Sequence, residues 1–160
     1  MRTATPDDAA AIENVRIATW KYAYRGVLDD GYLDGLAVTE PNVALRRQAL
    51  SSGRTRAFVA ESGGEVVGFS MYGDSRDELA DTEVYAIYVL PGHLSTGLGR
   101  ALMKETVAAI PADRSIGLWV LTGNPRARRF YERFGFTLSG HTKVDDGLEE
   151  VHYLLAARGD

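Results

Sequence analysis

The 160-residue sequence contains no cysteine. This absence excludes disulfide bonds, thiolate metal sites and a cysteine nucleophile, and it suits a protein of the reducing cytoplasm. No apolar run approaches the roughly 20 residues of a membrane-spanning helix. Acidic Asp7 and Asp8 stand where a secretory signal would be basic and then apolar. We therefore expect a soluble, cytoplasmic protein with no membrane partner.

Positive charge is also scarce, because 18 lysine and arginine residues face 22 acidic ones and the net charge is −4. An acidic chain repels polyanions, so nucleic acid is not an expected partner, whereas cationic amines are attracted. The three histidines have no metal-ligand spacing, and no metal is expected. With 45% hydrophobic residues the chain can form one well-packed core, and we predict a single domain over residues 1–160.

Apolar periodicity and turn residues predict the order of the elements. Strands are expected at 2–5, 56–61, 65–72, 83–89, 115–121, 136–143 and 150–156, and helices at 6–22, 29–36, 41–51, 97–110 and 124–134. Ser62-Gly63-Gly64 and Asp145-Asp146-Gly147 indicate hairpins, and the acidic segment 74–81 is typical of a solvated loop. One strand-helix-strand crossover among hairpins predicts a mixed α+β fold, with a mostly antiparallel central sheet flanked by helices.

A glycine-rich junction follows the strand expected at 83–89. The apolar run ends before Pro91, the loop contains Gly97 and Gly99, and an amphipathic helix comes next. The first N–H groups of a helix lack carbonyl partners and the helix dipole is positive there, so such a junction suits main-chain binding of a phosphate. Short glycine loops also join strands to helices for connectivity alone, and a pair of glycines does not decide between these interpretations.

A second motif lies downstream and gives the junction a context. Together the two motifs resemble those of the GNAT superfamily of acyl-CoA-dependent N-acetyltransferases. The first is matched by Val89, Gly97 and Gly99, and the second by Asn124, Ala127, Phe130, Tyr131, Glu132, Gly135 and Phe136. The resemblance covers roughly the whole chain, since residues 1–8 are similar to the family's opening strand and first helix cap. Two positions depart from the pattern: Leu94 stands where the family usually has Gln or Arg, and Ser95 where many members have another Gly.

The resemblance implies acetyl-CoA as co-substrate and a GNAT-like fold whose central strands splay to admit the pantetheine arm. Main-chain amides of the loop would bind the pyrophosphate, and donors near the end of the preceding strand would steady the carbonyl oxygen. The expected cofactor-binding residues are Tyr88, Val89, Leu94, Ser95, Thr96, Gly97, Leu98, Gly99, Arg100, Asn124 and Arg128. Asn124 also fits a helix cap, and the arginines of segment 126–129 also fit a solvated helix face.

Acetyl transfer to an amine requires a proton donor for the leaving thiolate and a proton acceptor for the amine. The resemblance implies Tyr131 as general acid, although a tyrosine here could also simply pack on the sheet. Glu83 is the candidate general base, while a water chain or a plain edge charge stays open as the alternative. An aromatic and acidic wall suits a cationic amine, so contact with the acceptor is expected from Trp20, Tyr24 and Tyr85.

These residues predict an acetyl-CoA-dependent N-acetyltransferase that acetylates a primary amine of a small molecule or peptide directly, in a ternary complex. The lack of cysteine agrees with a mechanism without an acyl-enzyme. The alternative is a non-catalytic acyl-CoA-binding sensor or interaction module on the same fold, which the departures at Leu94 and Ser95 favour. Antibiotics, polyamines, amino acids and protein N-termini all stay open as acceptors, and so does a homodimer formed through the closing strands.

Overall fold

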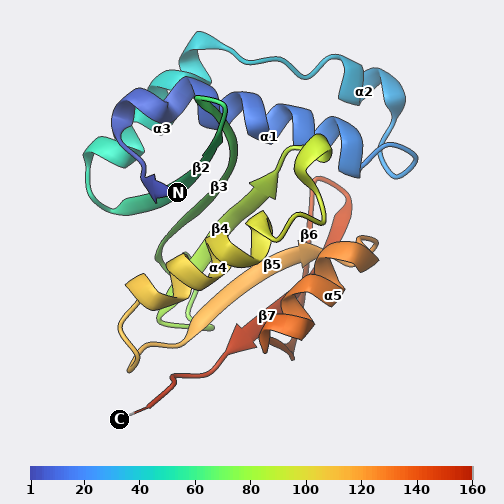
Figure 1. Ribbon diagram of the computed structural model, residues 1–160. Coiled ribbons are helices and arrows are strands. Elements are labelled where there is room, and N and C mark those ends of the chain that lie inside the picture. The colour runs from blue at the N-terminus through green and yellow to red at the C-terminus, as the bar shows by residue number, and fades with distance from the viewer. Residues whose placement is uncertain (160) are drawn as a thin grey trace. The chain divides into compact units, whose positions relative to one another are not determined.

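Seven strands are hydrogen-bonded in the order β1-β2-β3-β4-β5-β7-β6 (Figure 1). The computed structural model describes residues 1–159. They form two compact units. Unit 1 is Met1–Tyr72 with Ala86–Val107, and unit 2 is Gly73–Tyr85 with the residues from Ala108 onward. Strands β3 (Glu65–Asp74) and β4 (Thr82–Val89) each run through both units. The single domain predicted from the sequence stays a prediction.

Unit 1 holds the first half of the chain and the junction after β4. Besides parts of β3 and β4, it contains β1 (Arg2–Thr3), α1 (Ala9–Ala23), α2 (Asp30–Asp34), α3 (Glu40–Ser51), β2 (Thr55–Ser62) and most of α4 (Leu98–Ala109). Short 3-10 turns occupy Pro6–Asp8 and Pro91–His93. The helix predicted at 6–22 is therefore divided, because the Asp8 carboxylate accepts a hydrogen bond from the Thr5 N–H at 2.7 Å and is held by Arg2 at 2.8 Å.

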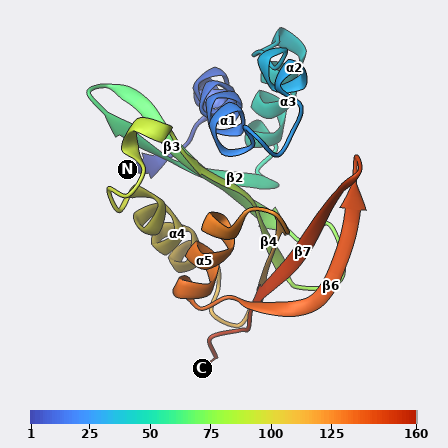
Figure 2. The same cartoon turned by 90° about the vertical axis from the view of Figure 1, so that its right-hand side faces the viewer.

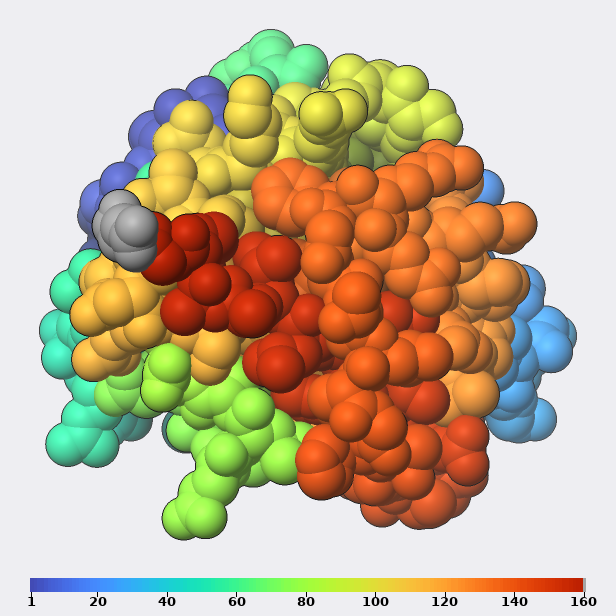
Figure 3. Space-filling model, turned by 90° about the horizontal axis from the view of Figure 1, so that it is seen from below, coloured from blue at the N-terminus to red at the C-terminus, as the bar shows by residue number. Residues whose placement is uncertain are grey.

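Unit 2 contains β5 (Ile116–Leu121), α5 (Pro125–Phe134), β6 (Thr137–Asp145) and β7 (Leu148–Leu155). Strand β5 pairs with β7 in antiparallel register along its whole length. Its parallel pairing with β4 covers only Thr82 and Glu83, which agrees with the predicted splaying of the central strands. The atoms of α5, β6 and β7, coloured orange to red, form one continuous surface in the view from below (Figure 3).

The mixed α+β fold with a mostly antiparallel sheet is confirmed, and its hairpin turns follow from local sequence. Gly63 and Gly64 both have positive φ, at 60° and 82°, as the two-residue hairpin turn requires. Asp146 and Gly147 repeat this geometry at 53° and 79°. The second turn is one residue shorter than predicted, because Asp145 still pairs with Leu148.

The sheet of unit 1 has helices on both faces, with α1 and α3 on one face of β2 and β3 and α4 on the other (Figure 2). On the α4 face, Leu102 packs with buried Ala60, Val67 and Val89. A Cβ at Gly68 would lie 3.2 Å from Leu102 Cδ1, so the lack of a side chain lets the helix approach the strand. None of the helices within residues 1–159 is long and apolar enough to cross a membrane.

Candidate functional site

The residues predicted to bind or react belong to both units, and each group is described within its own unit. Unit 1 carries Trp20, Tyr24, Tyr88, Val89 and the loop Leu94, Ser95, Thr96, Gly97, Leu98, Gly99 and Arg100, and unit 2 carries Glu83, Tyr85, Asn124, Arg128 and Tyr131.

The loop between β4 and α4 in unit 1 turns sharply before the helix begins. Ser95 and Gly97 have positive φ values of 62° and 86°. Thr96 Oγ1 donates a hydrogen bond to the His93 carbonyl at 2.5 Å, and the Ala101 N–H donates to the Gly97 carbonyl at 3.0 Å. Ser95, where the sequence departs from the glycine of many GNAT proteins, therefore adopts a left-handed conformation that glycine reaches without steric cost. Left-handed turns at a helix N-terminus can direct several N–H groups toward one anion.

Leu94 anchors this loop to the core. Leu94 and Leu98 both pack against the cluster that contains Val89 and Leu102. This apolar contact holds the loop against the core, in place of the hydrogen bonds that a polar side chain at this position would make. Leu98 and Leu102 are four residues apart on one face of α4, but Leu94 precedes the helix in an extended conformation, so helical periodicity did not predict its contact.

Three aromatic side chains of unit 1 that were predicted for different roles lie together. Trp20 Nε1 donates a hydrogen bond to Tyr88 Oη at 3.1 Å. The Trp20 and Tyr24 rings meet edge to face at 4.7 Å, and the Tyr88 ring packs against Phe69 at 5.6 Å. Tyr88 was predicted only as a main-chain donor, so its side-chain contact with Trp20 is a feature that the sequence did not predict.

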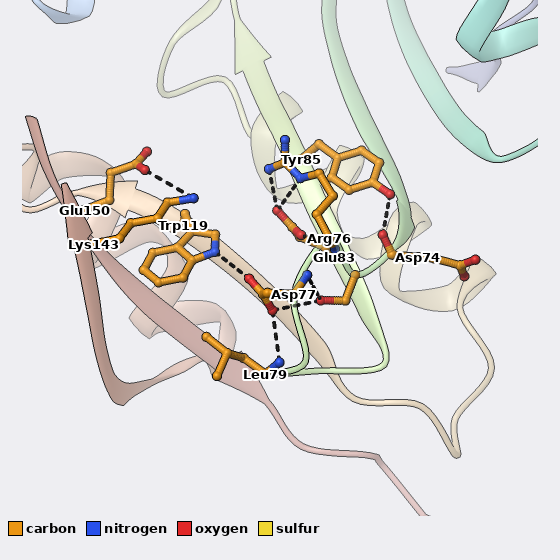
Figure 4. A network of polar contacts seen from close by, with 10 residues as sticks. Asp74, Arg76, Asp77, Leu79, Glu83, Tyr85, Trp119, Lys143 and Glu150 are labelled. Atoms are coloured by element: carbon orange, nitrogen blue, oxygen red, sulfur yellow. Dashed lines mark hydrogen bonds and ion pairs between the residues drawn. The ribbon is translucent and has the colours of Figure 1, made fainter. Parts of the chain in front are cut away.

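Glu83 in unit 2 is a buried carboxylate with a guanidinium partner. Its exposed fraction is 2%. Arg76 donates hydrogen bonds to its oxygens from the main-chain N–H at 3.0 Å, from Nη2 at 2.5 Å and from Nε at 3.2 Å (Figure 4). The hydrogen bond to Glu83 is the main cause that raises the pKa of Arg76. The loop predicted at 74–81 occupies residues 75–81, because β3 extends to Asp74. The contacts of Arg76 were not predicted.

Tyr85 lies beside this ion pair. The Arg76 guanidinium carbon is 4.8 Å from the centroid of the Tyr85 ring, which is a cation–π distance. The Tyr85 hydroxyl donates a short hydrogen bond to the Asp74 carbonyl. Burial raises the pKa of Tyr85, and the negative charge of Glu83 adds to the shift. Glu83, Tyr85 and Arg76 thus form one connected group.

The start of α5 is organised by Asn124 and Arg128. Asn124 Oδ1 accepts a hydrogen bond from the Ala127 N–H at 3.1 Å, so Asn124 caps the helix as its sequence position predicted. Arg128 donates from Nε to Tyr153 Oη and from Nη1 to the Thr122 carbonyl, both at 3.1 Å. These bonds fix Arg128 within unit 2. Cofactor contact by Asn124 and Arg128 stays a prediction.

Tyr131 is surrounded by aromatic rings. Its ring centroid lies 5.4 Å from Phe130, 6.2 Å from Phe136 and 6.4 Å from Tyr153. Phe136 and Tyr153 are almost fully buried, with exposed fractions of 1% and 0%. The ring is therefore oriented by packing, which a phenylalanine in its place would preserve.

The face of β5 and β7 that is opposite to α5 carries a polar cluster that the sequence did not predict. Trp119 Nε1 donates a hydrogen bond to Asp77 Oδ2 at 2.9 Å, and its ring lies 4.9 Å from that of His152. Ser139 Oγ is 2.8 Å from His152 Nδ1. Burial lowers the pKa of His152, and the nearby negative charge of Asp77 offsets this effect only in part. These residues are far apart in the sequence, and no local motif predicts that they are in contact.

The folded protein is expected to lose stability as the pH falls below about 6.5, the ordinary pKa of histidine. Because burial lowers the pKa of His152, the unfolded chain binds a proton at this site more readily than the folded chain does. The stabilisation is present above about pH 6.5 and is lost as the pH falls toward the lower pKa of the folded state. Urea unfolding at about pH 7.5 and about pH 5.5 measures the loss, which should be smaller in His152→Gln.

His93, which belongs to unit 1 and is not among the groups that act on His152, provides the control for this measurement, because His93→Gln should keep the pH dependence of the parent protein. A pH-dependent loss of equal size in His152→Gln and the parent would show that another group is responsible.

Comparison with known proteins supplies a context for these features. A sequence model of the acetyltransferase (GNAT) family matches residues 17–136. The chain is 28% identical over 145 residues to the probable N-acetyltransferase Rv2775 of Mycobacterium tuberculosis, covering 89% of this chain and 82% of that protein. It is 30% identical over 130 residues to the uncharacterized N-acetyltransferase YuaI of Bacillus subtilis, covering 78% and 73% of the two chains.

Solved structures share the fold at lower sequence identity. The PaiA N-acetyltransferase of Thermoplasma acidophilum, solved in complex with coenzyme A, superposes with a TM-score of 0.70 at 17% identity. The superposition covers 95% of this chain and 98% of that one.

Proposed function

Because the chain belongs to the acetyltransferase (GNAT) family, we propose that it transfers an acetyl group from acetyl-CoA to a primary amine of a small molecule or peptide. The observation that carries the proposal is the loop between β4 and α4, whose left-handed residues Ser95 and Gly97 directly precede the N-terminus of α4. The coenzyme A complex of the Thermoplasma protein, which is similar in fold, supports the choice of donor.

The main-chain N–H groups of Ser95–Arg100 would hold the pyrophosphate of the donor, since helix N-termini favour anions. Main-chain groups of Tyr88 and Val89 would receive the pantetheine arm and the carbonyl oxygen, and Asn124 and Arg128 would contribute further polar contacts. The bound donor supplies the reactive thioester. Every remaining step falls to side chains of this protein.

In the proposed reaction the neutral amine nitrogen attacks the thioester carbonyl carbon, a C–N bond forms and the C–S bond breaks. Tyr131 gives its hydroxyl proton to the leaving sulfur. The proton that the ammonium loses before the attack passes to Glu83, directly or through water, and the second proton, lost after the C–N bond forms, returns through solvent to the Tyr131 phenolate. Trp20, Tyr24 and Tyr85 would line the position of the acceptor, where aromatic rings favour a cationic amine before it is deprotonated.

Glu83→Gln is expected to lower kcat/KM for the amine about tenfold near neutral pH. The effect is below that of a strong general base, because both carboxylate oxygens of Glu83 already accept hydrogen bonds from Arg76. The loss should shrink as the pH rises, since a growing fraction of the amine is then neutral without help. Initial rates measured across pH test this expectation.

Glu78→Gln is the matched control, because Glu78 is an exposed carboxylate of the loop that precedes β4 and its replacement should leave the rates unchanged. A pH-independent loss in Glu83→Gln, or no loss at all, would leave water as the base.

The function is tested by calorimetric binding of acetyl-CoA, followed by thiol release with a panel of primary amines. Binding together with amine-dependent release is the expected result. Binding without release across a broad panel would support the alternative, an acyl-CoA-binding sensor, which the unusual Leu94 and Ser95 favour. Absence of binding would overturn both proposals. A cytoplasmic location and a homodimer stay predictions.

A further inference from the structure

The ammonium group of Lys143 lies on the face of unit 2 that carries the polar cluster of Trp119, Asp77 and His152. Lys143 Nζ lies 4.4 Å from the centroid of the Trp119 ring and 3.6 Å from Glu150 Oε2. Lys143 on β6 and Glu150 on β7 are directly paired in the sheet, and Trp119 belongs to the adjacent β5. Figure 4 shows Lys143 between the Trp119 ring and the Glu150 carboxylate. An aromatic face beside a carboxylate is the usual surrounding of an organic cation in a binding site.

The indole is held in place by contacts that do not involve Lys143. Asp77 accepts the hydrogen bond of Trp119 Nε1 at 2.9 Å, and His152 packs against the ring. Burial alone would raise the pKa of Asp77, but hydrogen bonds from Trp119 and the Leu79 N–H at 3.0 Å lower it below its ordinary value. The ring and its anionic anchor would therefore keep their positions without the lysine.

Lys143 is a displaceable occupant, because 41% of its side chain is exposed and it is carried on a flexible aliphatic stem. Glu150 is the carboxylate paired with Lys143, and Asp77 is bonded to the indole. Arg76, the other cation labelled in Figure 4, is paired with Glu83. Removal of Lys143 would take away the positive charge paired with Glu150, and the remaining negative charge beside the indole would attract a cation from solution.

We propose that Trp119 and Glu150 form a binding seat for an alkylammonium ligand, which Lys143 fills when no ligand is present. A ligand then enters by displacing the lysine ammonium into solvent. Lys143 therefore competes with small cations for the seat and raises the ligand concentration that is needed to fill it. The identification of that ligand with the cationic end of the acetyl acceptor rests on the proposed function. Cation binding itself does not depend on it.

The test uses the full chain and choline, a cation that has no primary amine to acetylate. The protein has two tryptophans, Trp20 and Trp119, so NMR can follow two indole N–H signals, and the loss of one in Trp119→Phe assigns them. In Lys143→Ala, choline should shift the Trp119 signal with a dissociation constant about tenfold lower than in the parent protein. The neutral isostere 3,3-dimethylbutan-1-ol should shift it far less.

Lys104→Ala removes an exposed lysine of unit 1 and should behave as the parent does. Adding Glu150→Gln to Lys143→Ala should weaken choline binding again. Equal shifts by choline and its neutral isostere, or equal choline affinity with and without Lys143, would overturn the proposal. If Lys143→Ala does not fold, saturating choline must shift the Trp119 signal of the parent, and a failure to do so overturns the proposal equally. Choline binding without amine acetylation would refute only the proposed function.

Discussion

Replacement of Tyr131 by phenylalanine is expected to lower kcat about a hundredfold, the usual scale for loss of a general acid. The dissociation constant of coenzyme A should stay nearly unchanged. The two effects separate because the ring, and not the hydroxyl, makes the aromatic contacts with Phe130, Phe136 and Tyr153. Turnover is measured by thiol release, and affinity by calorimetry on the same preparation.

Tyr22→Phe is the matched control, since this tyrosine is 58% exposed and loses the same single hydroxyl. Its turnover should equal that of the parent. A Tyr131→Phe variant that keeps full turnover, or that loses turnover and coenzyme affinity in equal proportion, would refute the general-acid role. A residual rate that rises for thiols of lower pKa would support the role, because such leaving groups have less need of an acid.

Gly117→Ala is expected to destabilise the protein by about 2 kcal/mol, within the range for overpacked cores. A Cβ at this position would lie 2.6 Å from His152 Nε2 and 3.0 Å from the Ala80 Cβ. His152 cannot readily give way, because it is 1% exposed, lies against Trp119 and is bonded to Ser139. Urea unfolding measures the change, which should appear as a lower midpoint at nearly constant slope.

Local sequence rules predict the opposite sign for this substitution, since alanine is ordinarily favoured over glycine within a strand. Gly123→Ala serves as the control, because a Cβ there meets no atom within 4 Å. The double variant Gly117→Ala/His152→Ala should be less unstable than the sum of its two single variants, since the clash is then absent. Strict additivity would show that the two side chains do not compete for space.

Features that depend on neighbours in the sequence were predicted correctly. The two glycines at 63 and 64 make their hairpin turn, and Asn124 followed by Pro125 starts α5 at the expected place. The loop before α4 adopts left-handed conformations at Ser95 and Gly97. In each case a few consecutive residues supply the backbone preference and the hydrogen bonds, so no distant part of the chain is required.

Features that depend on partners far along the chain, or across the sheet, were missed or could only be guessed. Glu83 was proposed as a base from its residue type, but its pairing with Arg76 depends on how the loop 75–81 folds over β4. The hydrogen bond between Trp20 and Tyr88 joins residues 68 positions apart. The ammonium seat at Trp119 requires β5, β7 and β6 to lie side by side in that order.

The sequence by itself determined the order of the elements, the mixed α+β class and the family, because these follow from periodicity, turn chemistry and two contiguous motifs. Tertiary structure alone decided which charged groups are paired, which rings are oriented and where a glycine cannot be replaced. The physical reason is that burial and Coulomb interactions act through space, so the chemistry of Glu83, Trp119 and His152 depends on strand register as much as on residue type.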